Sequence, residues 1–404
     1  MKVFTLQRKF GGFCCGLFHS FSILVAILFI PIQFAQAGEL MIVGIDTKVE
    51  LTNQGIVKRK PAGDAIAIFE ISKHPEKPLL VAELPLINSL FGPPTNLAIT
   101  PDGSLALVAN SVRWEQGDDG WESPPDNKIH VINLKADPPM VVDTVEAGKQ
   151  PSGLSISRDG QWMAVANRKD LSLSIFSIQG QAVTLTDTVG IEGEAAAVAM
   201  TPDAKRILVT KFAEHSVAMI ENQDGKLSYD GAQDLPVGRW PYNVQVTPNG
   251  RVALVANNGN KGQPDGHLDT VSVVDLAANP PRVVDHVVVG DGPEGMAISP
   301  DGKLAVVPLL DGSAPLFEGK WFFKEKGSVA ILSIDGTEVR KTGEVKVGRF
   351  PEGVGFSRDG RYVYVGDLLD DCVSILRVDG SQVEHTGKGI SLSGHPGSLR
   401  TMLP

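Results

Sequence analysis

Charged residues recur around a repeated proline, and their types and spacing would suit ligand binding or acid–base catalysis. The segments around this proline read "GKQP", "IEGEA", "GRWPY", "GDGPE", "GRFPE" and "SGHPG". Arginines and glutamates at equivalent repeat positions could clamp a carboxylate or polarise a carbonyl, with a glutamate or histidine as general base. Mixed charges could equally pair with one another, which would contribute little to stability. The candidate catalytic residues are Glu294, Glu352, Arg239, Arg349 and His395, and Lys149, Glu194 and Asp291 complete the expected ligand-binding ring.

Aromatic residues belong to the same expected surface. Four of the five tryptophans, together with one tyrosine, fall in loops on the side where this proline lies. Aromatic side chains on a polar loop surface can stack on a ring or anchor a partner, although each could equally pack its own loop down. The aromatic candidates for ligand binding are Trp114, Trp121, Trp240, Trp321 and Tyr242.

The elements that would position these residues come from an internal repeat. A proline, a small residue, two alternating apolar residues and a Pro-Asp-Gly-like turn recur, as in "PTNLAITPDGSLALVAN" and "PEGMAISPDGKLAVVPL". Copies lie about 44 to 58 residues apart, at or just above the spacing of propeller blades. The copies begin at Pro94, Pro151, Pro241, Pro293 and Pro351, a degenerate copy begins at Ala195, and a fragment begins at Pro396.

Each repeat reads as four short strands, and no stretch has a convincing helical period. The second strand, such as "LALVAN", is almost continuously apolar, which indicates burial on both faces of the sheet. The terminal fragment supplies a first strand, and the segments "LMIVGID", "AIAIFEI" and "PLLVAEL" supply the other three. The sequence therefore predicts an all-β, seven-bladed β-propeller of four-stranded antiparallel blades, in which strands from both ends of the chain close the last blade.

The first 37 residues are expected to be a signal peptide. A basic start and an apolar stretch are followed by Ala35-Gln36-Ala37, the small-x-small pattern of a cleavage site. Residues 38–404 would then form one propeller domain, periplasmic or secreted, without stable membrane insertion after cleavage. The whole chain has a net charge of −10, which disfavours nucleic acid as a partner. We expect a monomer that binds a small molecule or a protein.

Four long insertions should follow second strands on the side of the repeated proline. They begin at Val49, Ser111, Asn258 and Leu310. Long loops on a rigid scaffold usually carry function or are disordered. Two of them, "GDDGWESPPDN" and "NGNKGQPDGHLD", contain oxygen ligands that could hold a divalent cation, but neither has the spacing of a calcium loop. No metal ligands are therefore assigned.

The repeats resemble a known family. "SPDGKLAVV", "TPDGSLALVAN" and "VSVVDL" are similar to the YVTN-type repeat of exported bacterial proteins and of lactonase-like seven-bladed propellers. The resemblance covers residues 38–404 and implies the fold, but no catalytic residue can be transferred by it. Two functions stay open. The first is a binding propeller that presents a ligand or partner site. The alternative is a lactonase-like hydrolase acting on a small lactone or sugar acid, with Arg239 and Arg349 holding the substrate and Glu294 or Glu352 activating water.

Overall fold

The computed structural model describes residues 38–88, 92–223 and 225–402 of the chain. The predicted signal peptide lies outside these residues. Residues 38–404 form one compact unit. Strands dominate it, and the helices among the described residues are three short 3-10 turns: η1 (Gly231–Gln233), η2 (Pro315–Phe317) and η3 (Leu368–Asp370). No helix of the described part is long and apolar enough to cross a membrane.

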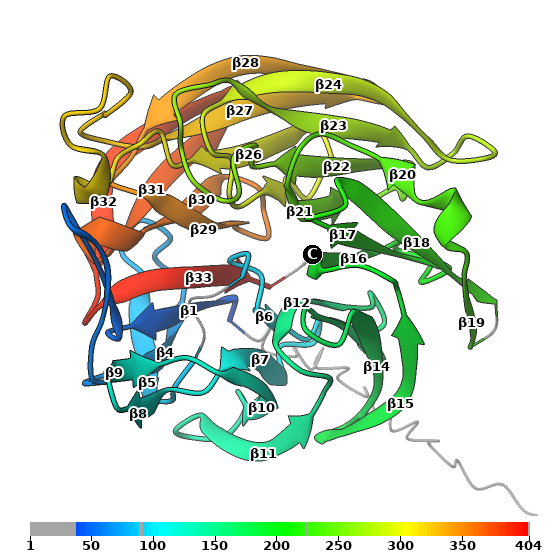
Figure 1. Cartoon of the computed structure of the whole chain (residues 1–404), viewed down its shortest axis with the longest axis horizontal. Coiled ribbons are helices and arrows are strands. Elements are labelled where there is room, and N and C mark those ends of the chain that lie inside the picture. The colour runs from blue at the N-terminus through cyan, green and yellow to red at the C-terminus, as the bar shows by residue number, and fades with distance from the viewer. Residues whose placement is uncertain (1–37, 89–91, 224, 403–404) are drawn as a thin grey trace, which may run out of the picture. The chain divides into compact units, whose positions relative to one another are not determined.

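Seven antiparallel sheets of four principal strands confirm the predicted propeller (Figure 1). We number the blades in chain order. Blade 1 is β33 (His395–Thr401), β1 (Leu40–Asp46), β4 (Ala65–Glu70) and β5 (Leu79–Pro85). Blade 2 is β6 (Leu97–Ile99), β7 (Leu105–Val112), β10 (Pro125–Asn133) and β11 (Met140–Glu146). Blade 3 is β12 (Pro151–Ile156), β13 (Trp162–Asn167), β14 (Ser172–Gln179) and β15 (Ala182–Gly190). Blade 4 is β16 (Ala195–Met200), β17 (Arg206–Lys211), β18 (Ser216–Gln223) and β19 (Lys226–Tyr229), with β20 (Leu235–Pro236) also on β18.

The remaining three blades repeat the same order from the inner to the outer strand. Blade 5 is β21 (Pro241–Val246), β22 (Val252–Asn257), β23 (Asp269–Asp275) and β24 (Arg282–Gly290). Blade 6 is β25 (Ala297–Ile298), β26 (Leu304–Leu309), β27 (Ser328–Asp335) and β28 (Glu338–Lys346). Blade 7 is β29 (Pro351–Phe356), β30 (Tyr362–Asp367), β31 (Cys372–Asp379) and β32 (Gln382–Ser391).

The ring closes as the sequence predicts, through the two ends of the described chain. β33 pairs with β1 in an antiparallel register that runs from Met41 opposite Thr401 to Asp46 opposite His395. In Figure 1 the red strand β33 lies beside the blue strand β1. Each inner strand also contacts the inner strand of the next blade, and the contact between β29 and β33 completes the circle. Without β33, the edge of β1 that faces the axis would be unpaired, which explains why a fragment at one end needs three strands from the other.

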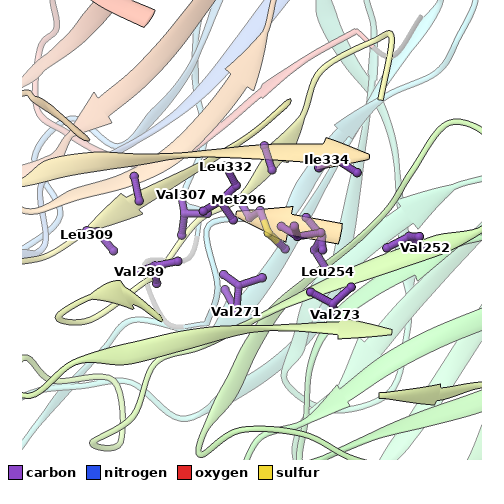
Figure 2. Packing of buried hydrophobic residues seen from close by; sticks show 14 residues of the cluster. Val252, Leu254, Val271, Val273, Val289, Met296, Val307, Leu309, Leu332 and Ile334 are labelled. Atoms are coloured by element: carbon purple, nitrogen blue, oxygen red, sulfur yellow. The ribbon is translucent and has the colours of Figure 1, made fainter. Parts of the chain in front are cut away.

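The hydrophobic core lies between the blades, because the almost continuously apolar second strands bury both faces. Seven clusters of buried side chains each join two neighbouring blades. Figure 2 shows the cluster between blades 5 and 6, where Leu254 and Val273 face Met296 and Val307. All four of these side chains are fully buried. The blades are therefore packed against one another along their length, and the loops between strands lie outside these cores.

Small residues two places after the repeated proline let neighbouring inner strands approach closely. A Cβ atom on Gly295 would lie 2.0 Å from the carbonyl oxygen of Glu352, and one on Gly353 would lie 2.5 Å from the backbone nitrogen of Leu399. Contacts this short between a Cβ and backbone atoms cannot be accommodated without moving a strand. The prediction that converging blades require small residues here is therefore explained by backbone proximity.

Gly295→Ala should destabilise the propeller by about 1–3 kcal/mol, the usual cost of overpacking. In a chain of this size each kcal/mol lowers the melting temperature by roughly 2 °C. Gly343→Ala is the matched control, since a Cβ at this exposed position on β28 would meet nothing within 4 Å. Thermal unfolding of both variants checks the prediction, and equal melting temperatures would contradict it.

Candidate functional site

Two sets of side chains meet where the inner strands begin, a region that we call the mouth of the propeller. The first set follows the repeated proline directly. The second set follows the last residue of each second strand, except in blade 2, where Ser111 lies within β7. Backbone hydrogen bonds join the second set to the residue that precedes the repeated proline, for example from Arg168 N to Gln150 O and from Asn258 N to Trp240 O. The first set is Thr95, Ser152, Ala196, Tyr242, Glu294, Glu352 and Gly397. The second is Thr47, Ser111, Arg168, Phe212, Asn258, Leu310 and Leu368.

Glu294 and Glu352 form a buried carboxyl pair at the mouth. Their relative exposures are 7% and 8%. Burial raises the pKa of Glu294 to about 8, and the positive charge of Arg168 opposes part of this rise. Burial also raises the pKa of Glu352 well above its usual range, and the negative charges of Glu294 and Asp46 raise it further. The negative charge of one carboxylate thus disfavours ionisation of the other.

An aromatic wall and one guanidinium stand beside this pair. The Arg168 guanidinium carbon lies 4.5 Å from the ring centroid of Phe212 and 6.0 Å from that of Tyr242. The centroids of Phe212 and Trp240 are 4.9 Å apart. Burial raises the pKa of Tyr242 to about 12, with further contributions from the charges of Glu294 and Glu352. These groups come from blades 3 to 7, so their electrostatic coupling places them together at the propeller axis.

Polar atoms without partners line the same region. The side-chain amide of Asn258 donates to Glu294 Oε2 at 2.5 Å and to Pro293 O at 3.3 Å. Among the described residues, nothing satisfies the buried hydroxyls of Thr95 and Ser152 or the side-chain oxygen of Asn258. Buried polar groups normally have a hydrogen-bond partner, so such atoms at a mouth point to water or a ligand. A Cβ on Gly92 would lie 2.4 Å from Ser152 Oγ and 3.5 Å from Arg168 Nη1. The Ser152 hydroxyl and the Arg168 guanidinium therefore lie close to each other beside Gly92.

Blade 1 carries a buried ion cluster that includes Asp46, whose charge raises the pKa of Glu352. The ammonium group of Lys48 pairs with the carboxylates of Asp46 and Asp64 and donates to the carbonyl of Asn88 at 2.9 Å. The three charged side chains are at most 2% exposed. Lys48 therefore ties the end of β1 to the insertion that begins at Val49. It also sets the environment of Asp46, whose charge acts on Glu352.

The structure separates the ring of charges that the sequence proposed. Only Glu294 and Glu352 come together. Arg349 Nε is 2.7 Å from an Asp370 oxygen, so this arginine is paired on its own blade. Arg239 and Lys149 are exposed, and Glu194 lies 3.6 Å from the ammonium of Lys169.

Two further members of that predicted ring organise loops. Asp291 accepts backbone hydrogen bonds from Asp265, at 3.1 Å, and from Gly266, at 2.9 Å. It thereby holds the insertion that begins at Asn258. His395 Nδ1 lies 2.5 Å from Asp371 Oδ1.

The tryptophans are divided between packing and exposure. Trp114 donates to Arg59 O at 2.7 Å, which packs it against the β2 (Val49–Thr52) and β3 (Gly55–Lys58) hairpin. Trp121 belongs to the short hairpin of β8 (Glu115–Gly117) and β9 (Gly120–Glu122). Trp321 is 78% exposed and touches His267 edge-on. Only Trp240 joins the mouth, through Phe212.

Sequence reasoning missed Arg168, Phe212 and Asn258. All three occupy one repeat position, directly after the second strand, and the predicted topology already places that position on the mouth side. An alignment of the repeats at this position would have shown one arginine, one phenylalanine and one asparagine among otherwise small or aliphatic residues. The aspartates of the insertions form no metal centre: within the described ranges, no group of three or more His, Cys, Asp or Glu side chains could hold an ion.

Fold and mouth together define a seven-bladed β-propeller with a buried carboxyl pair at its axis. The model of the family "Lactonase, 7-bladed beta-propeller" matches residues 131–239. Antigen Lp49 of Leptospira interrogans is 27% identical over 198 residues, which cover 48% of this chain and 40% of the antigen. The chain thus matches less than half of that relative's length.

Solved structures share the whole fold. A candidate 6-phosphogluconolactonase from Bacteroides fragilis is 17% identical with a TM-score of 0.67, covering 91% of this chain and 99% of that one. The periplasmic gluconolactonase PpgL of Pseudomonas aeruginosa is 17% identical with a TM-score of 0.64, over 91% and 99%. Hydrazine synthase of Kuenenia stuttgartiensis is 18% identical with a TM-score of 0.59, over 77% and 90%. At these identities the likeness concerns the fold alone, because propellers host unrelated chemistries.

Proposed function

We propose that this protein is a hydrolase that opens a small lactone, such as the lactone of a sugar acid, at the mouth of the propeller. The observation that carries the proposal is the buried pair of Glu294 and Glu352, whose pKa values are both raised and which faces Arg168. Two carboxyls that ionise at different pH values can act as base and acid at near-neutral pH. The matched lactonase model and the lactonase names among the structural neighbours support this choice over a purely binding role.

The chemistry needs one ionised and one protonated carboxyl. Glu294, ionised, accepts a proton from water as the water oxygen forms a bond to the lactone carbonyl carbon. The carbonyl electron pair moves onto its oxygen, where the Arg168 guanidinium stabilises the negative charge. The intermediate then collapses and the bond from carbon to ring oxygen breaks, while that oxygen takes the proton of Glu352. The product is a hydroxy acid. Transfer of the proton from Glu294 to Glu352 then restores the starting protonation state of the pair.

A panel of γ- and δ-lactones, including sugar-acid lactones, tests the proposal. Acid release by the purified protein is followed with a pH indicator and compared with spontaneous hydrolysis. We expect acceleration of at least one polyhydroxylated lactone. No acceleration over the spontaneous rate for any member of the panel would overturn the proposal.

The pH profile of this reaction should have an ascending limb set by Glu294. The active form appears when Glu294 loses its proton, so kcat/KM should rise with pH until about 8, the raised pKa of this carboxyl. Because the Arg168 charge lowers that pKa, Arg168→Met should move the limb to higher pH as well as slowing the reaction. Arg349→Met is the control, since Arg349 pairs with Asp370. An unmoved limb in Arg168→Met would contradict the assignment.

Ligand binding without turnover is the second candidate function. It is favoured by Trp321, whose ring is 78% exposed on the insertion that begins at Leu310. A sugar acid that raises the melting temperature, while its lactone is not hydrolysed, would support this function. For either function we propose a location in the periplasm or outside the cell, in keeping with the predicted signal peptide and with PpgL, which is named as periplasmic.

A further inference from the structure

The opposite end of the propeller axis holds a cavity. Its volume is about 130 Å³, and residues from blades 2 to 6 line it. The lining comes from the far ends of the inner strands and from the turns that follow them, away from the mouth. Four of the lining residues are the prolines that open these turns: Pro101, Pro202, Pro248 and Pro300.

The walls of this cavity are mainly apolar. Ile156 and Ile298, from blades 3 and 6, add branched side chains to the ring of prolines. An engineered apolar cavity of about 150 Å³ binds benzene, so a space of this size can take a short hydrocarbon chain. The cavity is open to solvent on one side, which leaves room for a polar head group at its rim. An apolar space of this size suits a short hydrocarbon chain better than a sugar.

One cation stands at this cavity without an anion. In blade 3 the turn begins with Arg158 in place of proline, and Arg158 belongs to the lining. Arg158 is exposed to solvent, and among the described residues its guanidinium makes one hydrogen bond, to Pro248 O at the long distance of 3.5 Å. Within the described part of the chain, no carboxylate lies within 4.0 Å of it. A guanidinium presents donors in a fork that matches a carboxylate, so this side chain has unused capacity for one.

Arg358, at the same position in another blade, offers a comparison. It opens the equivalent turn of blade 7, and its backbone nitrogen donates to Glu39 Oε1 at 2.6 Å. The positive charge of Arg358 also counteracts the rise that burial causes in the pKa of Glu39. Blade 7 therefore places a carboxylate near its arginine, although no ion pair within 4.0 Å joins Arg358 to it, whereas in blade 3 the lining of the cavity includes Arg158.

We propose that this cavity binds a small monocarboxylate with a short unbranched hydrocarbon chain. The carboxylate pairs with Arg158, and the chain packs against the four prolines, Ile156 and Ile298. Charge complementarity fixes the head of the ligand, and the apolar wall fixes its tail. The site shares no residue with Glu294, Glu352 or Arg168, so it stands whether or not the mouth hydrolyses lactones.

Titration of the full protein with hexanoate, followed by calorimetry or ligand-observed NMR, tests this site. We expect saturable binding that hexanamide, which lacks the charge, reproduces about tenfold more weakly or worse. Arg158→Gln should weaken hexanoate binding by a similar factor. Arg358→Gln is the matched control at the equivalent turn and should bind as the wild type does.

Three results would overturn the proposal. The first is the absence of saturable hexanoate binding by the folded wild type. The second is equal affinity in wild type and Arg158→Gln, in particular if Glu294→Gln instead abolishes binding, because hexanoate would then occupy the mouth. The third concerns the apolar wall. Ile298→Asn is a second probe that leaves the charge in place, and it should also weaken hexanoate. Unchanged affinity in Ile298→Asn would show that the ligand does not enter the cavity.

Discussion

Glu294→Gln should lower kcat for lactone opening by about 10²–10⁴-fold, the usual contribution of a positioned general base. Glutamine keeps the shape of the side chain and can still accept the Asn258 hydrogen bond, which is 2.5 Å long in the wild type. It cannot accept a proton from water. Because a neutral group replaces a buried carboxyl whose pKa is raised to about 8, folding should not suffer. Initial rates on the best lactone of the panel measure the loss.

Control variants separate this effect from a general disturbance of the mouth. Glu352→Gln should also be slow, since an amide cannot deliver a proton to the leaving ring oxygen. Arg349→Gln and Arg239→Gln should stay close to wild type, because neither guanidinium acts on the pKa of Glu294 or Glu352. If Glu294→Gln is folded and retains a third or more of the wild-type rate, Glu294 is not the general base.

Much of the fold could be predicted because each level of the sequence gives the same answer. The repeat fixes the blade, the turn after each inner strand fixes the register, and the apolar second strands require neighbours on both faces. The fragment beginning at Pro396 is a first strand without successors, and the strands beginning at Leu40 lack a first strand. The pairing of β33 with β1 confirms that the two segments share one blade. Interactions of this kind are decided by the backbone and its period, which a sequence displays directly.

The mouth was less predictable because side-chain direction and pairing decide it. The repeat predicts that Glu294 and Glu352 lie at one axis, since both follow the repeated proline of their blades. It could not show that Arg349 would turn outward to Asp370, because that partner comes from η3 in the same blade. Arg168 escaped notice for the converse reason. Its importance comes from Phe212 and Tyr242, which belong to other blades.

Burial of Glu294 and Glu352 at the mouth lowers the free energy of unfolding wherever these carboxyls would be ionised in water. A carboxyl whose pKa is higher in the folded than in the unfolded chain makes folding less favourable as pH rises between the two values. For Glu294 this window runs from the ordinary 4.5 to about 8. The seven interblade cores supply the compensating stability, and the buried ion cluster of blade 1 fixes the charge next to Glu352. That cluster is therefore where a single substitution should affect both stability and the mouth.

Lys48→Met should destabilise the protein by about 3–5 kcal/mol, the usual cost of removing one partner from a buried ion cluster. Methionine fills a similar volume but leaves the carboxylates of Asp46 and Asp64, both at most 2% exposed, without their shared cation. Two like charges would then remain side by side in a dry environment, and the carbonyl of Asn88 would lose its donor. Denaturant unfolding measures the change in free energy.

The matched control for this prediction is Lys388→Met. Lys388 also pairs with a carboxylate, that of Glu76 at 2.5 Å, but its side chain is 56% exposed. Pairs of this kind contribute about 0–1 kcal/mol, so its loss should hardly be measurable. Asp46→Asn combined with Lys48→Met should recover part of the stability, because one of the two stranded charges is removed. If Lys48→Met unfolds no more easily than Lys388→Met, the ion cluster is not what holds the end of β1 in place beneath Glu352.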